Sequence, residues 1–333
     1  MQAHKINSTA CRSRSVIGAR FQGARGQYSA WDSGVTFHRP VIRPYFLAVH
    51  AMTRYYSRPF MLGAVLIAAL GLPFSASAAD SYYLSLGDSL AAGVQPPPVS
   101  KNQGYADQLQ AMIPNLKLMK LGCYTNESTY AMINGGHCYH AGASQLDTAV
   151  AFLQTHNVAL ITIDIGANDV LPCAKSGFDT TCVTSGLTSI QQNLPIILTK
   201  LRAVAGKDVP IIGMNYYDPY IATYIIGDPT FEATLPGFSQ INDTLEMIYR
   251  AAKSPVADVA GAFSTTDSKT LVLSPNFGTI PLDVARVCQW TWMCDPTSIN
   301  AHFGDQVYIH PNNTGYGIIA GSFYQVLPSS VRK

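Results

Sequence analysis

Five apolar runs alternate with helical patterns along most of the chain, and this alternation constrains the fold more than any other feature. The runs have the length and composition of buried strands and cover 82–86, 116–121, 158–165, 210–215 and 256–260. Between the third and fourth runs, six aliphatic residues from Leu187 to Leu201 fall on one face of a helix. Strands that alternate with helices form parallel sheets with right-handed crossovers. We therefore predict an α/β fold with three layers, αβα, around a mostly parallel five-stranded sheet.

Residues 52–78 have the pattern of a secretory signal peptide. Arg54 and Arg58 form a basic start, 61–72 an apolar core, and Ala76-Ser77-Ala78 a small-residue cleavage site. The core is short for a bilayer span, which makes an uncleaved membrane anchor the weaker alternative. Residues 1–51 carry seven Lys or Arg against one acid. We interpret them as an extension from a start codon assigned too early, with a disordered basic arm as the alternative.

Without this leader the chain is acidic and has the length of one domain. Residues 79–333 carry 13 Lys or Arg against 19 Asp or Glu, a net charge of about −6, although the whole chain has +2. An acidic chain without a basic stripe gives no electrostatic reason to expect a nucleic-acid partner. No linker or repeat divides 79–333. We predict a single secreted or extracytoplasmic domain there, with no stable membrane span after signal cleavage.

The cysteines of this domain form three pairs of near neighbours: Cys123 and Cys138, Cys173 and Cys182, Cys288 and Cys294. Six cysteines allow 15 pairings. We predict pairing between neighbours, because closing short loops is their simplest use in an exported protein. A metal site using His137, Cys138 and His140 is the alternative, but it lacks the two close-spaced ligand pairs typical of structural zinc. The prediction is therefore disulfides and no metal.

Three distant segments carry side chains suited to nucleophilic catalysis. Ser89 lies in Gly-Asp-Ser-Leu after the first apolar run, Asn168 in Gly-Ala-Asn-Asp after the third, and His310 in a turn before the last helical pattern. We expect them to converge, because active centres of such folds lie where strand ends meet loops at one edge of the sheet.

Each of these side chains has a chemical role and a simpler alternative. His310 can take the proton of Ser89 as it attacks a carbonyl, and the Asn168 amide and Ser89 N–H can hold the resulting oxyanion. Alternatively, Ser89 caps a helix, Asn168 forms an Asx turn and His310 is a solvated turn residue. We expect the neighbouring Asp88 and Asp169 to bind backbone N–H groups.

At these motifs the chain resembles the SGNH, or GDSL-type, esterase and lipase family, especially its secreted actinobacterial branch. Ser89 lies in a match to the family's first block, Asn168 to the third and His310 to the last, and the resemblance covers nearly all of 80–330. It implies a flavodoxin-like αβα fold with no cofactor or metal. It also implies hydrolysis of lipid or small-molecule carboxylic esters through an acyl-serine intermediate.

Two positions depart from the family pattern. The second block normally supplies a glycine N–H to the oxyanion hole, whereas here Asn126 aligns best and Gly122 is the alternative. Asparagine is the residue after glycine that most readily adopts a left-handed backbone. The family's orienting acid normally lies three residues before the histidine, where this chain has Val307. Asp305, or a backbone carbonyl near Val307, is the candidate to support the ring of His310.

The same constellation leaves other functions open. The chain could be a polysaccharide deacetylase or a thioesterase, or an inactive relative that binds glycans or lipids through aromatic loops near Tyr216, Tyr217, Trp290 and Trp292. An intact serine, histidine and asparagine favour an active enzyme. The expected partner is therefore an ester substrate, whether a lipid, a small molecule or an acylated glycan.

Overall fold

The computed structural model describes residues 80–96, 101–140, 142–295 and 308–332. The signal peptide expected at 52–78 and the extension expected at 1–51 lie outside the described residues. Asp305 and Val307 lie outside them as well. The description below concerns the predicted domain alone.

Five strands form one parallel sheet with the order β2-β1-β3-β4-β5. They are β1 (Ser81–Gly87), β2 (Lys117–Lys120), β3 (Asn157–Asp164), β4 (Ile211–Met214) and β5 (Val256–Ala257). β1 and β3 pair along the whole of β1, from Ser81 opposite Asn157 to Gly87 opposite Asp164. The mostly parallel five-stranded sheet predicted from the sequence is confirmed.

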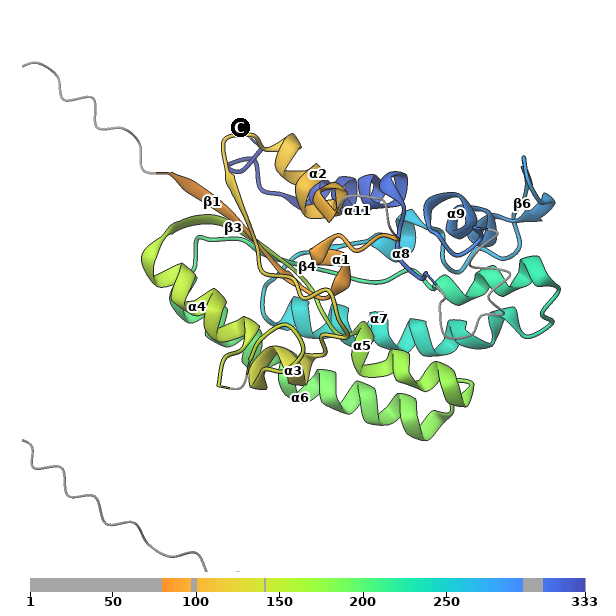
Figure 1. Cartoon of the computed structure of the whole chain (residues 1–333), viewed down its shortest axis with the longest axis horizontal. Coiled ribbons are helices and arrows are strands. Elements are labelled where there is room, and N and C mark those ends of the chain that lie inside the picture. The colour runs from red at the N-terminus through yellow and green to blue at the C-terminus, as the bar shows by residue number, and fades with distance from the viewer. Residues whose placement is uncertain (1–79, 97–100, 141, 296–307, 333) are drawn as a thin grey trace, which may run out of the picture. The chain divides into compact units, whose positions relative to one another are not determined.

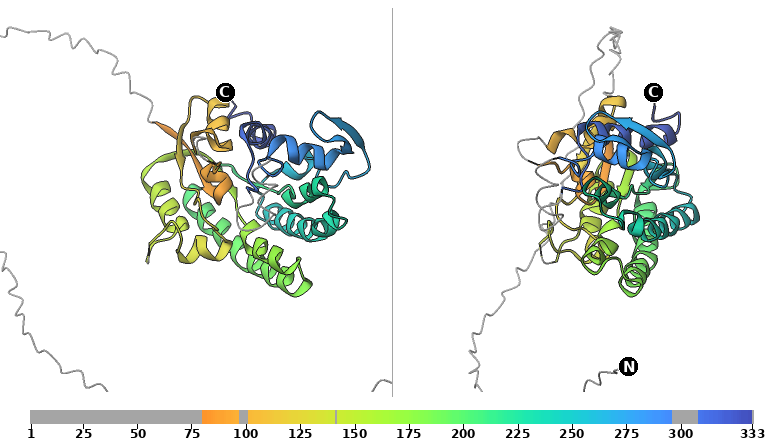
Figure 2. Two further views of the ribbon diagram at one scale, coloured as in Figure 1. Left: turned by 45° about the vertical axis from the view of Figure 1, so that its right-hand side comes forward. Right: turned by 90° about the vertical axis from the view of Figure 1, so that its right-hand side faces the viewer.

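Helices cover both faces of this sheet (Figure 1). One layer contains α2 (Tyr105–Met112), α8 (Val259–Ala262) and α11 (Asn313–Val326), and the other α3 (Thr129–Asn134), α4 (Gln145–Thr155), α5 (Ala167–Val170), α6 (Thr180–Ala205) and α7 (Leu235–Ala251). The two layers remain on opposite sides of the sheet when the molecule is turned (Figure 2). The three-layer αβα prediction is therefore confirmed.

The core lies where the strands meet these helices. Leu84 and Leu86 of β1 and Ile161 and Ile163 of β3 are fully buried. The aliphatic stripe predicted between Leu187 and Leu201 supplies Ile190, Leu194, Ile197, Leu198 and Leu201 of α6, all of which are buried. α6 contains Pro195 in its interior, and burial of this stripe helps to offset the cost of that proline.

Several segments carry more helix than the sequence patterns predict. We expect loops over 171–185 and 217–238, but α6 begins at Thr180 because the Asp179 side chain caps it, accepting hydrogen bonds from the backbone N–H groups of Thr181 and Cys182. The other segments contain the 3₁₀ helices η2 (Leu171–Ser176), η3 (Pro219–Ile226) and η4 (Phe231–Thr234). β5 is correspondingly short, since Asp258 caps α8 immediately after it.

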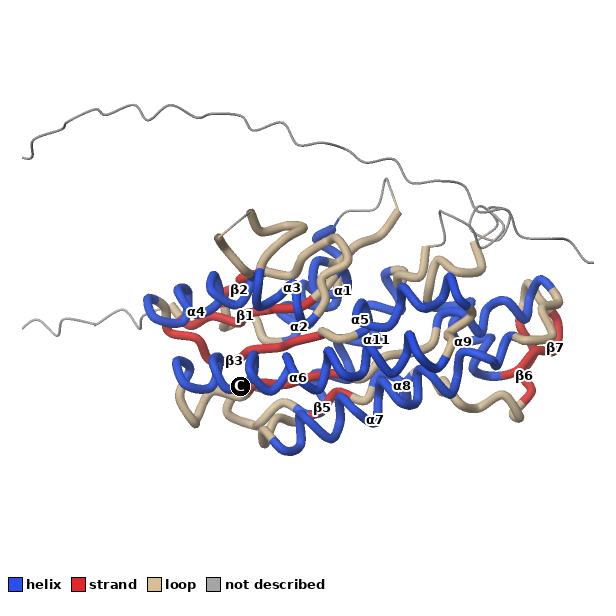
Figure 3. Tube along the Cα trace, turned by 90° about the horizontal axis from the view of Figure 1, so that it is seen from below, coloured by secondary structure: helices blue, strands red, loops and turns tan. Residues whose placement is uncertain are grey.

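The remaining elements are short or lie outside the two helical layers. The one-turn helix α1 (Ser89–Ala92) follows β1, η1 (Lys101–Gln103) precedes α2, and α9 (Leu282–Trp290) follows a hairpin of β6 (Leu271–Ser274) and β7 (Gly278–Pro281). This antiparallel hairpin lies at one end of the molecule, away from the main sheet (Figure 3). Within the described residues, no helix is both long enough and apolar enough to span a membrane.

Three disulfides close short loops, as Cys123–Cys138, Cys173–Cys182 and Cys288–Cys294. These are the neighbour pairs that the spacing predicts. The first holds the loop after β2 that contains Asn126, and the third holds the segment against which the His310 turn is bonded. Two of the three disulfides thus lie beside the predicted site.

Candidate active site

Ser89 lies at the sharp turn between β1 and α1. Gly87 ends the strand with φ of +135°, and a Cβ there would lie 2.1 Å from the carbonyl oxygen of Asp164, so only glycine fits. The Asp88 N–H then donates to the same Asp164 carbonyl at 3.0 Å, and the Asp88 side chain caps α1 by accepting from Leu90 N–H at 2.8 Å. Asp88 is therefore the cap, as expected for a loop-fixing residue, and Ser89 is the first residue of the helix.

His310 faces this serine across 221 residues of sequence. Its Nε2 lies 2.8 Å from Ser89 Oγ. The turn that carries it is fixed on both sides: Trp292 N–H donates to the His310 carbonyl at 3.0 Å, and the Tyr217 hydroxyl donates to the Ile309 carbonyl at 2.5 Å. The structure thus brings together the two side chains that the sequence proposes as base and nucleophile.

The surroundings of the His310 imidazole favour its neutral form. Burial lowers its pKa to about 4, because the charged form would lose hydration without gaining a counter-charge. Its Nδ1 is fully covered and has no hydrogen-bond partner among the described residues. Asp305, the candidate orienting acid, lies outside those residues. A neutral ring with Nε2 toward a hydroxyl is the form that accepts a proton.

Asn168 lies at the carboxyl edge of the sheet next to these two groups. Gly166, with φ of +124°, lets the chain turn from β3 into α5, and Asn168 is the second residue of that helix. The Asn168 amide donates one hydrogen bond to the Glu127 carbonyl at 3.0 Å, which fixes its orientation. The neighbouring Asp169 accepts from the N–H and hydroxyl of Thr129 at 2.8 and 2.7 Å, so it ties α5 to α3.

The loop after β2 brings Asn126 to the same place. Asn126 has a positive φ of +20° and is exposed in a groove that Ser89 and Asn168 also line. Gly122, the alternative oxyanion donor, instead packs against α1, where a Cβ would lie 2.5 Å from that of Ala91. Its lack of a side chain therefore has a packing reason, and the geometry favours Asn126 among the two.

A pair of buried carboxyl groups lies directly beneath the nucleophile turn, and the sequence motifs give no account of it. Asp88 and Asp164 are almost fully buried and are hydrogen bonded to each other. Tyr105 donates to Asp164 at 2.5 Å and Tyr216 to Asp88 at 3.2 Å. Burial raises the pKa of Asp88 to about 6 and that of Asp164 well above its usual range. The pair therefore holds a proton near neutral pH.

A signal for this pair is present in the sequence. Asp164 is the acidic residue inside the otherwise apolar run 158–165, and a carboxyl on a buried central strand needs partners. Gln145 is a second missed residue. Its side chain accepts from Gly87 N–H at 2.6 Å and donates to the Gly87 carbonyl at 2.9 Å. It therefore makes hydrogen bonds at the end of β1 that a neighbouring strand would otherwise make. Gln145 is a single polar residue at the start of α4, and it gives no comparable signal.

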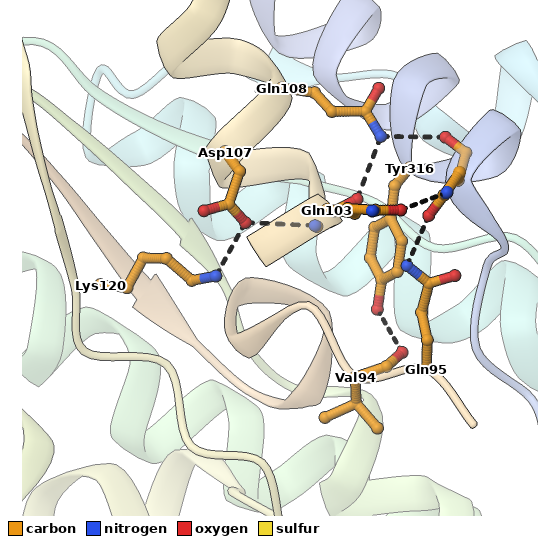
Figure 4. Close-up of polar contacts among 9 residues, drawn as sticks. Val94, Gln95, Gln103, Asp107, Gln108, Lys120 and Tyr316 are labelled. Atoms are coloured by element: carbon orange, nitrogen blue, oxygen red, sulfur yellow. Dashed lines mark hydrogen bonds and ion pairs between the residues drawn. The ribbon is translucent and has the colours of Figure 1, made fainter. Parts of the chain in front are cut away.

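A polar network joins the segment after the nucleophile to the helix after the base (Figure 4). The Tyr316 hydroxyl of α11 donates to the Val94 carbonyl at 2.8 Å, and the Gln95 amide donates to Asn313 Oδ1 at 2.8 Å. Gln108 of α2 donates to the Asn313 carbonyl at 2.9 Å. These bonds link the two chain segments that carry the serine and the histidine, which limits how far the segments can separate.

Among the described residues, no group of three or more His, Cys, Asp or Glu side chains is arranged to hold a metal ion. His137 and Cys138, part of the alternative metal site, are accounted for otherwise: Cys138 is in a disulfide and His137 lines the groove. The groups that do converge at this edge of the sheet are a hydroxyl, an imidazole and amide donors.

Comparison with known proteins assigns this chain to a family. The model of the GDSL-like Lipase/Acylhydrolase family matches residues 85–318, a span that contains Ser89, Asn168 and His310. The chain belongs to this family. Membership makes this GDSL-like protein a hydrolase of the esterase and lipase class. A search of curated protein sequences found no match.

Solved structures similar to this GDSL-like protein include three enzymes. The lipase Lip_vut3 from a goat rumen metagenome is 18% identical with a TM-score of 0.46, the match covering 74% of this chain and 96% of that one. Axe2, an acetylxylan esterase from Geobacillus stearothermophilus, is 17% identical with a TM-score of 0.47, covering 74% and 93%. Phospholipase A1 from Streptomyces albidoflavus NA297 is 14% identical with a TM-score of 0.45, covering 75% and 100%.

Proposed function

We propose that the protein is a secreted serine carboxylesterase or lipase that acts through an acyl-serine intermediate. The observation that carries this proposal is the distance of 2.8 Å between His310 Nε2 and Ser89 Oγ, beside the Asn168 amide. A nucleophile and its base within hydrogen-bond reach is the geometry that acyl transfer requires. The predicted signal peptide and the disulfides support an extracytoplasmic location.

In the acylation step, Ser89 Oγ bonds to the carbonyl carbon of the ester while His310 Nε2 takes the hydroxyl proton. The carbonyl oxygen becomes an oxyanion, for which we assign three donors: the second N–H of the Asn168 amide and the backbone N–H groups of Ser89 and Asn126. Each such donor contributes about 10²- to 10³-fold in rate in enzymes of this type. When the carbon–oxygen bond to the alcohol breaks, His310 returns the proton to the departing alcohol.

Deacylation repeats these steps with water as the nucleophile. His310 takes a proton from water as its oxygen bonds to the acyl carbon, and then returns that proton to Ser89 Oγ as the carboxylic acid leaves. Because burial lowers the pKa of His310, its neutral form is present over a wide pH range. A partner at Nδ1 that stabilises the charged ring would raise this pKa toward the operating pH, where a general base is most effective. Support for Nδ1 by Asp305, or by a carbonyl near Val307, remains part of the proposal.

Replacement of the serine tests this function. Ser89→Ala should reduce hydrolysis of p-nitrophenyl acetate by at least about 10³-fold and leave the circular dichroism spectrum unchanged. A fluorophosphonate probe should label the wild-type protein but not this variant. Ser81→Ala, at the other end of the same strand, is the matched control and should hydrolyse and label like wild type. Turnover retained by Ser89→Ala would remove this residue from the mechanism.

The same preparation separates the related activities. Acetylated xylan and acyl-thioesters should be assayed beside simple esters, since all three reactions use the same acyl-serine chemistry. Labelling by the probe without turnover of any of these substrates would indicate a different acyl donor. Absence of both labelling and turnover would indicate an inactive binding protein.

A further inference from the structure

Two spaces of very different size meet at Ser89. One is a small cavity of about 30 Å³, and the other is a wide groove of about 920 Å³. Ser89, Asn168 and His310 line both. An ester carbonyl bound at Ser89 would therefore have the cavity on one side and the groove on the other.

The small cavity is chemically suited to a hydrocarbon group. Its wall contains Leu90, Ala167, Pro219 and Phe238, of which Phe238 is buried in α7. Polar groups also line it, but their hydrogen bonds are already made: the Tyr216 hydroxyl donates to Asp88, and the Tyr217 hydroxyl donates to the Ile309 carbonyl. Neither tyrosine has a hydroxyl proton left to bind a polar ligand.

The groove has a different character. Its lining is mixed: Asn126, Ser128, His137 and Asp228 alternate with apolar residues such as Phe178, Tyr220 and the partly exposed Phe231. A leaving alcohol must receive a proton from His310 and then depart into water. A groove of this volume provides both the space and the exit, whereas the small cavity provides neither.

We propose that the small cavity is the acyl site and that it limits the enzyme to acyl groups of two to four carbons, while the alcohol part of the ester lies in the groove. This inference rests on the proposed function of Ser89. A cavity needs about 10 to 15 Å³ to hold one group of the size of a water molecule or a methylene. A cavity of about 30 Å³ therefore holds two to three such groups. The carbonyl carbon stays at Ser89, so a cavity that holds at most three further groups admits acyl chains of at most four carbons.

A series of p-nitrophenyl esters tests this limit on the wild-type protein. The acetate, butyrate, octanoate and palmitate share one leaving group, so kcat/KM reports the acyl site alone. We expect kcat/KM to fall by at least tenfold between butyrate and octanoate. Values for octanoate or palmitate equal to or above that for butyrate would overturn the proposal and place the acyl chain in the groove.

A variant of the cavity wall tests where the acyl group lies. Phe238→Leu removes ring volume from the wall, and the octanoate-to-butyrate ratio of kcat/KM should rise at least fivefold. Phe152→Leu in α4 makes the same change at another buried phenylalanine outside the cavity and should leave that ratio unchanged. If Phe238→Leu does not fold, Pro219→Ala removes ring volume from the cavity wall at a residue that does not line the groove. An unchanged ratio in a folded wall variant would overturn the assignment.

Failure of the inference differs from failure of the proposed function. If Ser89 is not a nucleophile, no ester of the series turns over through it and the fluorophosphonate probe does not label it, which overturns both proposals together. If Ser89 is labelled but long esters react as well as short ones, only the acyl-length limit is wrong.

Discussion

Replacing one carboxyl of the buried pair beneath the nucleophile should change how stability depends on pH. Asp88→Asn keeps the shape of the side chain, and its Oδ1 can still cap α1. Its Nδ2 can donate to Asp164 in place of the proton that the pair now holds. The Tyr216 hydroxyl, which donates to Asp88 Oδ2 in the wild type, can turn and accept from Nδ2 instead. The variant therefore removes a titrating group and keeps the cap on α1.

The direction of this pH dependence follows from the raised pKa of Asp88. Burial raises the pKa of Asp88 from 3.8 to about 6 in the folded protein. Below about pH 4 both folded and unfolded chains hold the proton; between about pH 4 and 6 only the folded chain does, so the free energy of unfolding falls as pH rises. At about 1.4 kcal/mol per pH unit, the loss is about 3 kcal/mol. The asparagine of the variant does not titrate and escapes this loss.

Thermal unfolding measured by circular dichroism at pH 4 and pH 7.5 checks the prediction. The Tm of Asp88→Asn minus that of wild type should be about 6 to 12 °C larger at pH 7.5 than at pH 4. The opposite contribution of His310, whose pKa is lowered, is present in both proteins and cancels. A difference in Tm that is the same at both pH values would show that Asp88 is already ionised in the folded protein, and the reasoning would fail.

A partly exposed carboxylate outside the site provides the matched control. Asp267 accepts a hydrogen bond from Thr270 N–H at 3.0 Å, which lowers its pKa. Such a group titrates mainly below pH 4, so its contribution to stability changes little between the two pH values. Asp267→Asn should therefore show nearly the same Tm difference from wild type at pH 4 and at pH 7.5.

Three further measurements test the base, one disulfide and the glycine before the nucleophile turn. Because burial lowers the pKa of His310 to about 4, kcat/KM for p-nitrophenyl acetate should stay flat from about pH 8 to 5 and halve near pH 4. A midpoint at or above 6.5 would contradict this expectation and favour Asp305 over a backbone carbonyl as the partner of Nδ1. Replacing Cys123 and Cys138 together by alanine should lower the unfolding free energy by about 3 kcal/mol in urea denaturation, as expected for a loop of about 15 residues; a loss below about 1 kcal/mol would contradict this expectation. Gly87→Ala should give no soluble folded protein, since its Cβ would lie 2.1 Å from the Asp164 carbonyl oxygen; a purified variant with the wild-type Tm would refute this.

Much of the fold could be predicted because its signals are local. Apolar runs of strand length and a 3.6-residue aliphatic stripe are properties of short segments, and their alternation leaves few topologies. The predicted element boundaries are wrong where a capping side chain determines the start of a helix. Asp179 starts α6 inside an expected loop, and Asp258 starts α8 inside an expected strand. A side chain that satisfies one or two backbone N–H groups at a helix start outweighs a weak periodicity.

The candidate site could be predicted in part for the same reason. Ser89, Asn168 and His310 each lie in a short motif next to a strand or helix end, and strand ends meet at one edge of a parallel sheet. The motifs do not predict which buried residues pack under the nucleophile turn. Asp164 and Gln145 support the nucleophile turn through contacts that span 58 residues or more of sequence. An acid inside an apolar run indicates that Asp164 needs a partner, but no local pattern shows which residue that partner is.

The sequence by itself determined which chemical groups the protein could bring to a sheet edge, because strand periodicity and strand-end motifs are written in consecutive residues. Only the tertiary structure decided how those groups are used. The distance of 2.8 Å between His310 and Ser89, the shared proton of Asp88 and Asp164, and the cavity of about 30 Å³ all come from packing between distant segments. Distance, burial and free volume are properties of that packing, and no single segment of the chain contains them.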